Sequence, residues 1–213
     1  MPVILASQRW VSKTPHGHVT ETLDQSWAHF CTALGWSLIP AFTGQDERKL
    51  FESLQPHALL LTGGNDLSQV NTDPLCAGRD SWEKRLLDEA LKRKLPVIGI
   101  CRGMQFLVAS LGGSLVAIDG HAAEKHAIVA APEVPKDLDA QWFTRDFVPS
   151  FHDWGVSDLP AGMKALAFDI EGHVEACISE CWQALGLLWH PERNPESDER
   201  DIALIQQFLA LAA

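Results

Sequence analysis

The sequence predicts an α/β fold in which helices cover both faces of a mainly parallel sheet. Apolar runs of strand length alternate with amphipathic helical patterns in the first half of the chain and again at its end. This alternation is typical of parallel sheets, because each crossover between parallel strands needs a helix. Loops with unusual chemistry follow three of the predicted strands. Sites in such sheets form beyond the carboxyl ends of the strands, so these loops are the candidate site.

The first half of the chain contains four apolar runs that predict buried strands. They cover residues 3–6, 36–39, 58–61 and 96–100. A helix is predicted between the first two strands, because Leu23, Trp27, Phe30 and Leu34 recur at helical spacing and Gly35 suits a helix C-terminus. Further helices are predicted from the pattern of the following residues. They cover residues 47–53, a segment that starts at Asp80 with Glu83 three residues later, and residues 102–111.

The second half gives fewer indications of its elements. Its predicted strands cover residues 126–130, 174–178 and 185–189. The charged and proline-rich stretch 131–139 is predicted as a surface loop. A last helix buries Ile202, Ile205, Phe208 and Leu209, with Ser197 or Asp198 as its cap. No repeat or linker interrupts the chain, so we expect one domain over residues 1–213.

Composition excludes several classes of function. With 17 basic and 28 acidic residues, the formal charge of −11 disfavours nucleic acid as a partner. No apolar run approaches the roughly 18 residues of a membrane span, and no basic segment precedes the short apolar N-terminus as in a signal peptide. The five cysteines are irregularly spaced, and Cys177 and Cys181 lack a second ligand pair. We expect a cytoplasmic protein with no membrane partner, no metal and no cofactor.

The segment from Gly99 to Gly103 predicts a nucleophile. It has the form G-x-C-x-G and joins the fourth strand to a helix. A nucleophile elbow needs such a turn, because the reactive residue sits on strained backbone and the flanking glycines relieve crowding. The helix NH groups favour a Cys101 thiolate, and the NH of Arg102 can donate to an oxyanion. The alternative is a buried core cysteine, which the two glycines make less favoured.

Two residues after the last strand predict the base and the group that orients it. His190 and Glu192 are two positions apart, so in an extended segment they point the same way. Pro191 is expected to keep that segment from becoming helical. His190 can accept the thiol proton and Glu192 can hold the tautomer of His190, although a structural histidine is the alternative.

The Gly63-Gly64 pair after the third strand predicts a loop that aims NH groups at developing negative charge, or else a plain turn.

These motifs together resemble the class I glutamine amidotransferase superfamily. The segments GICRGMQ, LLLTGGNDL and LLWHPER are most similar to its γ-glutamyl hydrolase branch, the γ-glutamyl-γ-aminobutyrate hydrolase-like peptidases of group C26. The resemblance covers nearly the whole chain, with the motifs in family order. It implies a flavodoxin-like sheet, attack of cysteine on a γ-glutamyl amide, and a γ-glutamyl-thioester that water hydrolyses.

The resemblance also implies roles for individual residues. Gly64 and Arg102 resemble the oxyanion-hole donors. The expected contacts to a small γ-glutamyl substrate are Gly63, Asn65, Gln105, Ser150, Phe151 and His152. Two departures from the family pattern matter. Arg102 follows the nucleophile as in stand-alone hydrolases, and Leu188 replaces a glutamine that often precedes the Trp-His-Pro-Glu motif.

The short chain is similar to a subgroup that includes the hydrolase of γ-glutamyl-CDP-amidate, linked to phosphoramidate modification of surface polysaccharides. Phosphate contacts would then be expected from Arg9, Arg79, Lys125 and Arg145, each of which has a solvated surface position as its alternative. Three other functions stay open: hydrolysis of γ-glutamyl-γ-aminobutyrate, a glutaminase that needs a separate synthetase partner, and a non-enzymatic binding protein. The sequence leaves the oligomeric state open, a homodimer included.

Overall fold

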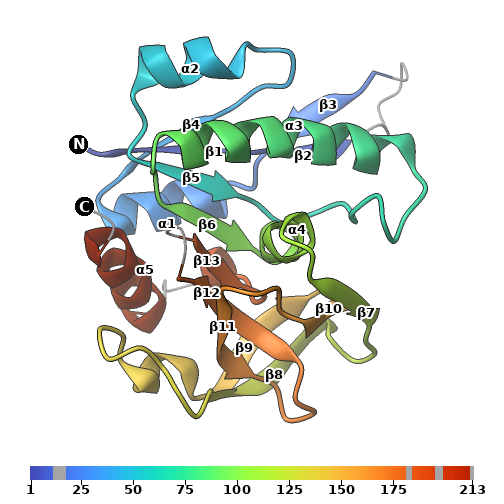
Figure 1. Ribbon diagram of the computed structural model, residues 1–213, viewed down its shortest axis with the longest axis vertical. Coiled ribbons are helices and arrows are strands. Elements are labelled where there is room, and N and C mark those ends of the chain that lie inside the picture. The colour runs from blue at the N-terminus through green and yellow to red at the C-terminus, as the bar shows by residue number, and fades with distance from the viewer. Residues whose placement is uncertain (12–17, 181–183, 195–198, 212–213) are drawn as a thin grey trace.

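The computed structural model describes residues 1–11, 18–180, 184–194 and 199–211, and its core is one large mixed sheet (Figure 1). Five parallel strands form one side of this sheet in the order β4-β1-β5-β6-β13. They are β4 (Ser37–Pro40), β1 (Val3–Ala6), β5 (Ala58–Leu61), β6 (Val97–Ile100) and β13 (Ala184–Leu187). The predicted α/β class and the mainly parallel central sheet are confirmed.

Antiparallel strands continue the sheet beyond β13 in the order β12-β11-β8-β9. They are β12 (Val174–Ser179), β11 (Met163–Phe168), β8 (Ala122–Ala130) and β9 (Arg145–Phe151). Off this path, β10 (Trp154–Asp158) pairs with β12, and β7 (Ser114–Ala117) pairs with β10. A separate hairpin pairs β2 (Arg9–Val11) with β3 (Thr20–Thr22). The sequence prediction missed the hairpin and β7, β9, β10 and β11, because these strands lack long apolar runs.

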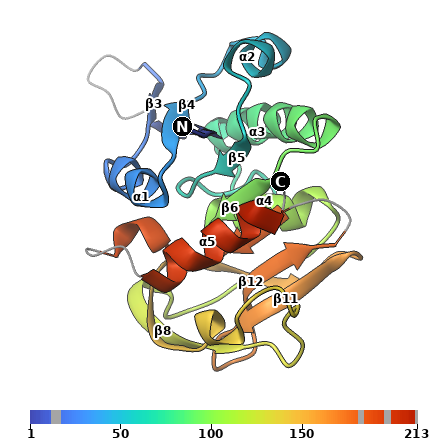
Figure 2. The same ribbon diagram turned by 90° about the vertical axis from the view of Figure 1, so that its left-hand side faces the viewer.

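Helices cover both faces of the parallel strands, as Figure 2 shows from the side. Helices α1 (Ser26–Leu34) and α5 (Glu199–Leu211) pack on one face. On the other face lie α2 (Glu47–Leu54), α3 (Pro74–Lys92) and α4 (Arg102–Ser110). Neighbouring residues of β5 alternate between these two layers, because strand side chains point to opposite faces: Leu60 packs with α1 and α5, and Leu59 packs with α3. Short 3₁₀ turns form at η1 (Ala140–Phe143) and η2 (Pro191–Arg193).

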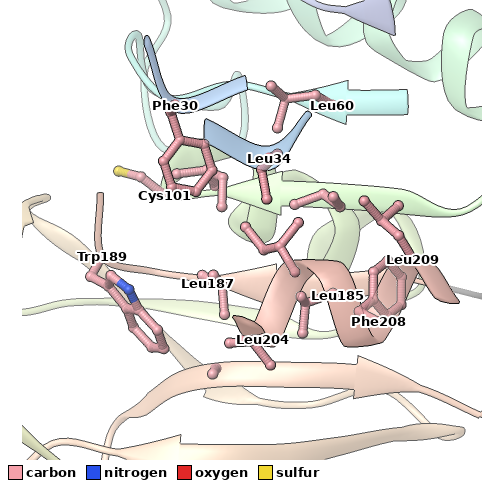
Figure 3. Packing of buried hydrophobic residues seen from close by; sticks show 14 of the residues in the cluster. Phe30, Leu34, Leu60, Cys101, Leu185, Leu187, Trp189, Leu204, Phe208 and Leu209 are labelled. Atoms are coloured by element: carbon pink, nitrogen blue, oxygen red, sulfur yellow. The ribbon is translucent and has the colours of Figure 1, made fainter. Parts of the chain in front are cut away.

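The layer under α1 and α5 is a continuous apolar core that reaches Cys101 (Figure 3). Phe30 of α1, Leu187 and Trp189 belong to this core together with Cys101, and all three are buried. The nucleophile candidate is therefore held by packed strand and helix residues rather than by a surface loop. Among the described helices, none is long and apolar enough to cross a membrane.

Several predicted boundaries are wrong for physical reasons. Helix α3 begins at Pro74 with Asp73 as its cap, and the Asp73 side chain accepts from the NH of Leu75 at 2.9 Å. Proline suits this first helical position because its missing NH has no partner there. Asp80 instead lies within the helix. The predicted caps at residues 197 and 198 lie outside the described residues.

Gly103→Ala tests how tightly the parallel layer packs. A Cβ at Gly103 would lie 2.0 Å from the carbonyl oxygen of Leu61, so the backbone of β5 or α4 would have to move. We expect the free energy of unfolding in urea to fall by about 3 kcal/mol or more. Gly120→Ala is the control, because its φ of 81° imposes strain but no atom lies within 4 Å. The Gly120→Ala control should lower the free energy of unfolding by ~1 kcal/mol. Equal losses in the two variants would contradict the packing.

Candidate active site

Cys101 occupies a strained turn between β6 and α4. Its backbone angles are φ 52° and ψ −109°, a region that residues with a Cβ rarely adopt. A Cβ on Gly99 would lie 2.6 Å from the carbonyl group of Gly103, and alanine is equally excluded at Gly103 itself. The predicted need for glycine on both sides of the cysteine is therefore confirmed. The turn places the thiol beyond the carboxyl end of β6, at the N-terminus of α4.

His190 joins Cys101 to Glu192. The charge of Cys101 acts on His190, and His190 Nδ1 lies 2.6 Å from Glu192 Oε1. All three residues are buried. The segment does not stay extended, because Pro191–Arg193 forms the 3₁₀ turn η2, so the expectation that Pro191 prevents a helical turn is wrong. Proline fits the first position of that turn, and Glu192 still reaches the imidazole.

The neighbours of His190 favour its protonated form. Burial alone lowers its pKa, but the charge of Cys101 and the hydrogen bonds to Cys101 and Glu192 raise the pKa of His190 to about 9. The imidazole can therefore carry a proton at neutral pH, held between a sulfur and a carboxylate. This arrangement suits a group that must deliver a proton to a leaving group.

The other described cysteines lie in environments that disfavour a thiolate. Burial raises the pKa of Cys31 and of Cys177 to about 12. Burial also raises the pKa of Cys76. Reactive cysteines need a stabilised thiolate, and none of these three is joined to a histidine. Cys101 is thus the best nucleophile in the described part of the chain, and Cys181 lies outside it.

The glycine loop after β5 lies directly over the Cys101–His190 pair. A Cβ on Gly63 would lie 2.8 Å from His190 Cε1 and 3.5 Å from Cys101 Cβ. Gly64 has a φ of 80°, and a Cβ there would lie 2.4 Å from Arg9 Cδ. Only glycine allows the backbone to come this close. The backbone of the loop therefore lies directly against Cys101 and His190.

A buried ion network fixes this loop relative to the elbow. Arg79 donates from Nη2 to the carbonyl of Thr62 at 2.7 Å and from Nη1 to the carbonyl of Gly63 at 3.0 Å. It also pairs with Glu83 at 2.9 Å, and neither side chain is exposed. Glu83 in turn binds Arg102, the first residue of α4. One carboxylate thus connects the glycine loop, α3 and the nucleophile turn.

Two of the four residues expected to contact phosphate are bound inside the fold instead. Arg79 is engaged by backbone carbonyls and Glu83, so it does not face a phosphate. Arg145 is buried and pairs with Asp201 at 2.7 Å. Of the other two cations, Lys125 is exposed on β8 and Arg9 lines a cavity beside the glycine loop. The side chain of Arg102 is paired with Asp80 and Glu83.

Two cavities meet at Gly64. One, of about 250 Å³, contains Cys101 and is bounded by α4 and the segment after β9. Its lining includes the predicted residues Asn65, Arg102, Gln105, Phe151 and His152. The other, of about 390 Å³, is lined by Gly63, His190, Glu192, Arg9, Arg193 and residues 22–25.

Some of the predicted substrate contacts lie at the cavity wall, and others are bound to backbone groups or lie away from the cavities. Phe151 packs edge-on against His190 at 5.4 Å between ring centroids. Gln105 Nε2 donates to the carbonyl of Trp154 at 2.7 Å, which orients it at the cavity wall. Asn65 lines the cavity, but its amide pairs with the backbone of Trp10 at 3.0 Å. Ser150 is fully buried and donates to the carbonyl of His121 at 2.7 Å, so it lines neither cavity.

Two residues that shape the site were not predicted from the sequence. Glu83 was expected only at a helix cap, although the Arg79–Glu83 spacing of four is typical of an ion pair on a helix. Arg193 carried no prediction, yet it stacks on Phe151 at 4.3 Å and lines the larger cavity. In the sequence, the position of Arg193 directly after the Trp-His-Pro-Glu motif indicated that it could lie at the site.

Comparisons with known proteins indicate the family and the fold. The sequence model of the family described as peptidase C26 matches residues 12–192. A Mycobacterium tuberculosis protein, provisionally named a glutamine amidotransferase, is 32% identical over an alignment of 157 residues that covers 65% of this chain and 51% of that protein. This chain therefore spans about half the length of that relative.

Two relatives carry more specific names. The γ-glutamyl-CDP-amidate hydrolase of Campylobacter jejuni is 27% identical, over 72% of this chain and 70% of that protein. The γ-glutamyl-γ-aminobutyrate hydrolase of Escherichia coli is 25% identical, over 91% of this chain and 87% of that protein. A glutamine amidotransferase from Thermotoga maritima shares the fold with a TM-score of 0.68 at 19% identity, covering 99% of this chain and 84% of that one.

Glu83→Gln tests the ion network. Although burial opposes it, the charges of Arg102 and Arg79 hold the pKa of Glu83 below its usual value. A lowered pKa stabilises the fold above the unfolded-state value near ~4.3, and this stability is lost as pH falls through the folded-state pKa. We expect Glu83→Gln to lose ~3 kcal/mol of unfolding free energy at pH 7, measured in urea. The difference from the unmodified protein should shrink below pH ~4.

The control for this variant lies on the same helix. Asp88→Asn removes the exposed pair of Asp88 with Lys84, which should cost less than ~1 kcal/mol at any pH. If Glu83→Gln were no more harmful than Asp88→Asn, the network would not stabilise the site.

Proposed function

Because the chain belongs to the peptidase C26 family, we propose that it hydrolyses a γ-glutamyl amide bond to glutamate and an amine. The observation that carries this proposal is that Cys101, at a strained turn, and His190, paired with Glu192, lie together under a glycine loop. A thiol, a histidine and a carboxylate in this order are the parts of a nucleophilic hydrolase. The relatives named above support the γ-glutamyl part of the substrate.

The first step is attack of the Cys101 thiolate on the amide carbonyl carbon. A carbon–sulfur bond forms and the carbonyl π electrons move to oxygen. The oxyanion can accept hydrogen bonds from the backbone NH of Gly64 and from that of Arg102, which has no partner within its helix because it is the first residue of α4. His190 then gives its proton to the amine nitrogen as the carbon–nitrogen bond breaks.

The second step removes the γ-glutamyl-thioester. Water loses a proton to His190 and attacks the thioester carbon, and the carbon–sulfur bond breaks to regenerate the thiolate. Glu192 keeps the imidazole oriented and stabilises its charged form in both steps, since its carboxylate contacts Nδ1. Cys101, His190 and Glu192 are the proposed catalytic residues.

The two cavities indicate where the two parts of the substrate bind. The cavity of about 250 Å³ that contains Cys101 can hold the γ-glutamyl group, with Gln105 and Phe151 at its wall. The leaving amine then enters the cavity of about 390 Å³ beyond His190. Arg9 and Arg193 line that cavity, and guanidinium groups bind phosphate well. These features favour a nucleotide-linked amine such as γ-glutamyl-CDP-amidate, used in phosphoramidate modification of surface polysaccharides, over γ-aminobutyrate.

The substrate assignment is tested by glutamate release from three compounds. We expect the highest kcat/KM for γ-glutamyl-CDP-amidate, then γ-glutamyl-γ-aminobutyrate, then glutamine. Arg9→Gln should lower kcat/KM for the first compound more than for the second, because only the first carries phosphates. Glutamine turnover that appeared only with a co-purifying synthetase would show a glutaminase subunit instead.

Cys101→Ala is the direct test of the nucleophile. Glutamate release from the best of these substrates should fall by at least ~10³-fold. Cys31→Ala is the matched control, because Cys31 is a buried core thiol whose loss should leave turnover within about two-fold of the unmodified protein. A Cys101→Ala protein that kept its activity would overturn the proposal.

The pH profile tests Glu192. Activity needs the His190 proton, so kcat/KM should decline above pH ~9, following the raised pKa of His190. Glu192→Gln removes a charge that raises this pKa, so the alkaline limb should move to lower pH. The Glu192→Gln substitution should also lower kcat by about 10²-fold or more. Glu199→Gln, an exposed change on α5, should leave the profile in place. An unmoved alkaline limb in Glu192→Gln would contradict the role of Glu192.

A further inference from the structure

Three histidines and a glutamate gather inside the antiparallel half of the sheet. His121 directly precedes β8, His126 lies on β8, His152 directly follows β9, and Glu175 lies on β12. One potential ligand atom from each lies within 4.8 Å of the others. In the sheet, β8 pairs with β9 and is separated from β12 by β11, and these strands lie in the lower half of Figure 1. The mechanism proposed above uses none of the four residues as a reacting group.

The polar atoms of this cluster are buried without hydrogen-bond partners. They are His121 Nδ1, His126 Nε2, both ring nitrogens of His152 and both carboxylate oxygens of Glu175. Glu175 is 0% exposed and His152 is 5% exposed. Buried polar groups are normally satisfied, so an unpaired carboxylate facing three imidazoles calls for a ligand between them.

The distances match a metal better than a hydrogen-bonded network. Glu175 oxygens lie 3.5 Å from His121 Nδ1, 3.7 Å from His126 Nε2 and 3.8 Å from His152 Nε2. These separations are long for hydrogen bonds. Ligand atoms around tetrahedral zinc, with bonds of ~2.0–2.1 Å, lie about 3.4 Å apart.

A second shell already orients two of the imidazoles. His126 Nδ1 lies 3.1 Å from the carbonyl of Ala127, which leaves Nε2 to face Glu175. His121 Nε2 lies 3.3 Å from Asp169 Oδ2, which leaves Nδ1 to face Glu175. Asp169 is itself held by the backbone NH groups of Glu171 at 2.9 Å and His173 at 2.8 Å. Carbonyl and carboxylate partners of this kind are typical behind metal-binding histidines.

We propose that His121, His126, His152 and Glu175 bind one divalent transition-metal ion, with zinc as the expected ion. Imidazole and carboxylate ligands suit zinc, and four protein ligands make a closed site of the structural kind. The charges also balance, because Glu175 and Asp169 together offset the two charges of the ion. The sequence expectation of no metal rested on the spacing of Cys177 and Cys181. The proposed ligands come from three separate segments, so no local spacing indicates them.

The metal would position one wall of the active-site cavity. His152 lies between Phe151, which contacts the ring of His190, and Trp154, whose carbonyl accepts from Gln105. A ligand bond at His152 would therefore fix the segment that faces Cys101 across the smaller cavity. The ion would act through this segment and not on the substrate.

Metal content tests the inference without any activity assay. The full chain, without a histidine tag, is produced in zinc-supplemented medium, purified by gel filtration and analysed by inductively coupled plasma mass spectrometry. We expect about one zinc per chain. Removal by a chelator should lower the melting temperature, and cobalt added to the stripped protein should give the intense visible absorption of a tetrahedral site. A stripped protein that neither takes zinc from a chromophoric chelator nor gains melting temperature with zinc would overturn the proposal.

Variants locate the site. Glu175→Gln and His126→Ala should each weaken zinc binding by at least ~10-fold in the chelator competition. His29→Ala is the control, because His29 is exposed on α1 and should bind zinc like the unmodified protein. Unchanged zinc affinity in both cluster variants would overturn the assignment. If they do not fold, the cobalt spectrum and zinc uptake of the unmodified protein decide the question.

Discussion

The buried contact of Glu83 with Arg79 and Arg102 is the interaction on which the site depends. Arg79 holds the carbonyls of the glycine loop, Arg102 begins the helix that follows the nucleophile, and Glu83 joins both from α3. Two buried guanidinium groups next to each other would repel without this carboxylate. Since Gly63 lies against both Cys101 and His190, a small shift of the loop would change the geometry of the reacting atoms.

The other wall of the site comes from the antiparallel half of the sheet. Phe151 packs on His190, and the backbone NH of His190 donates to the carbonyl of Pro149 at 3.0 Å. The strand β9 therefore positions the base directly. The parallel half supplies the nucleophile and the antiparallel half supplies the wall, so the substrate cavity lies where the two halves meet. A metal bound by His152 and Glu175 would make that wall rigid.

The parallel strands could be predicted because burial on both faces leaves nearly pure apolar runs, as in Ala58–Leu61 and Val97–Ile100. The elbow could be predicted because glycines two residues before and after a cysteine, at a strand-to-helix junction, are typical of a strained nucleophile turn. The antiparallel strands were mostly missed, since their residues alternate and pair with distant segments. Arg79 and Arg145 were expected to contact phosphate or solvent, because local sequence does not show the acids, Glu83 and Asp201, that bind them in the fold.

The central claim is that Cys101 carries the γ-glutamyl group during turnover. It is tested most directly by labelling the protein with a glutamine-like electrophile and locating the adduct by peptide mass spectrometry. We expect one adduct per chain, on the peptide that contains Cys101, with loss of glutamate release in proportion to labelling. Full glutamate release from a protein whose Cys101 is completely labelled, or inactivation by an adduct on another cysteine, would contradict the claim.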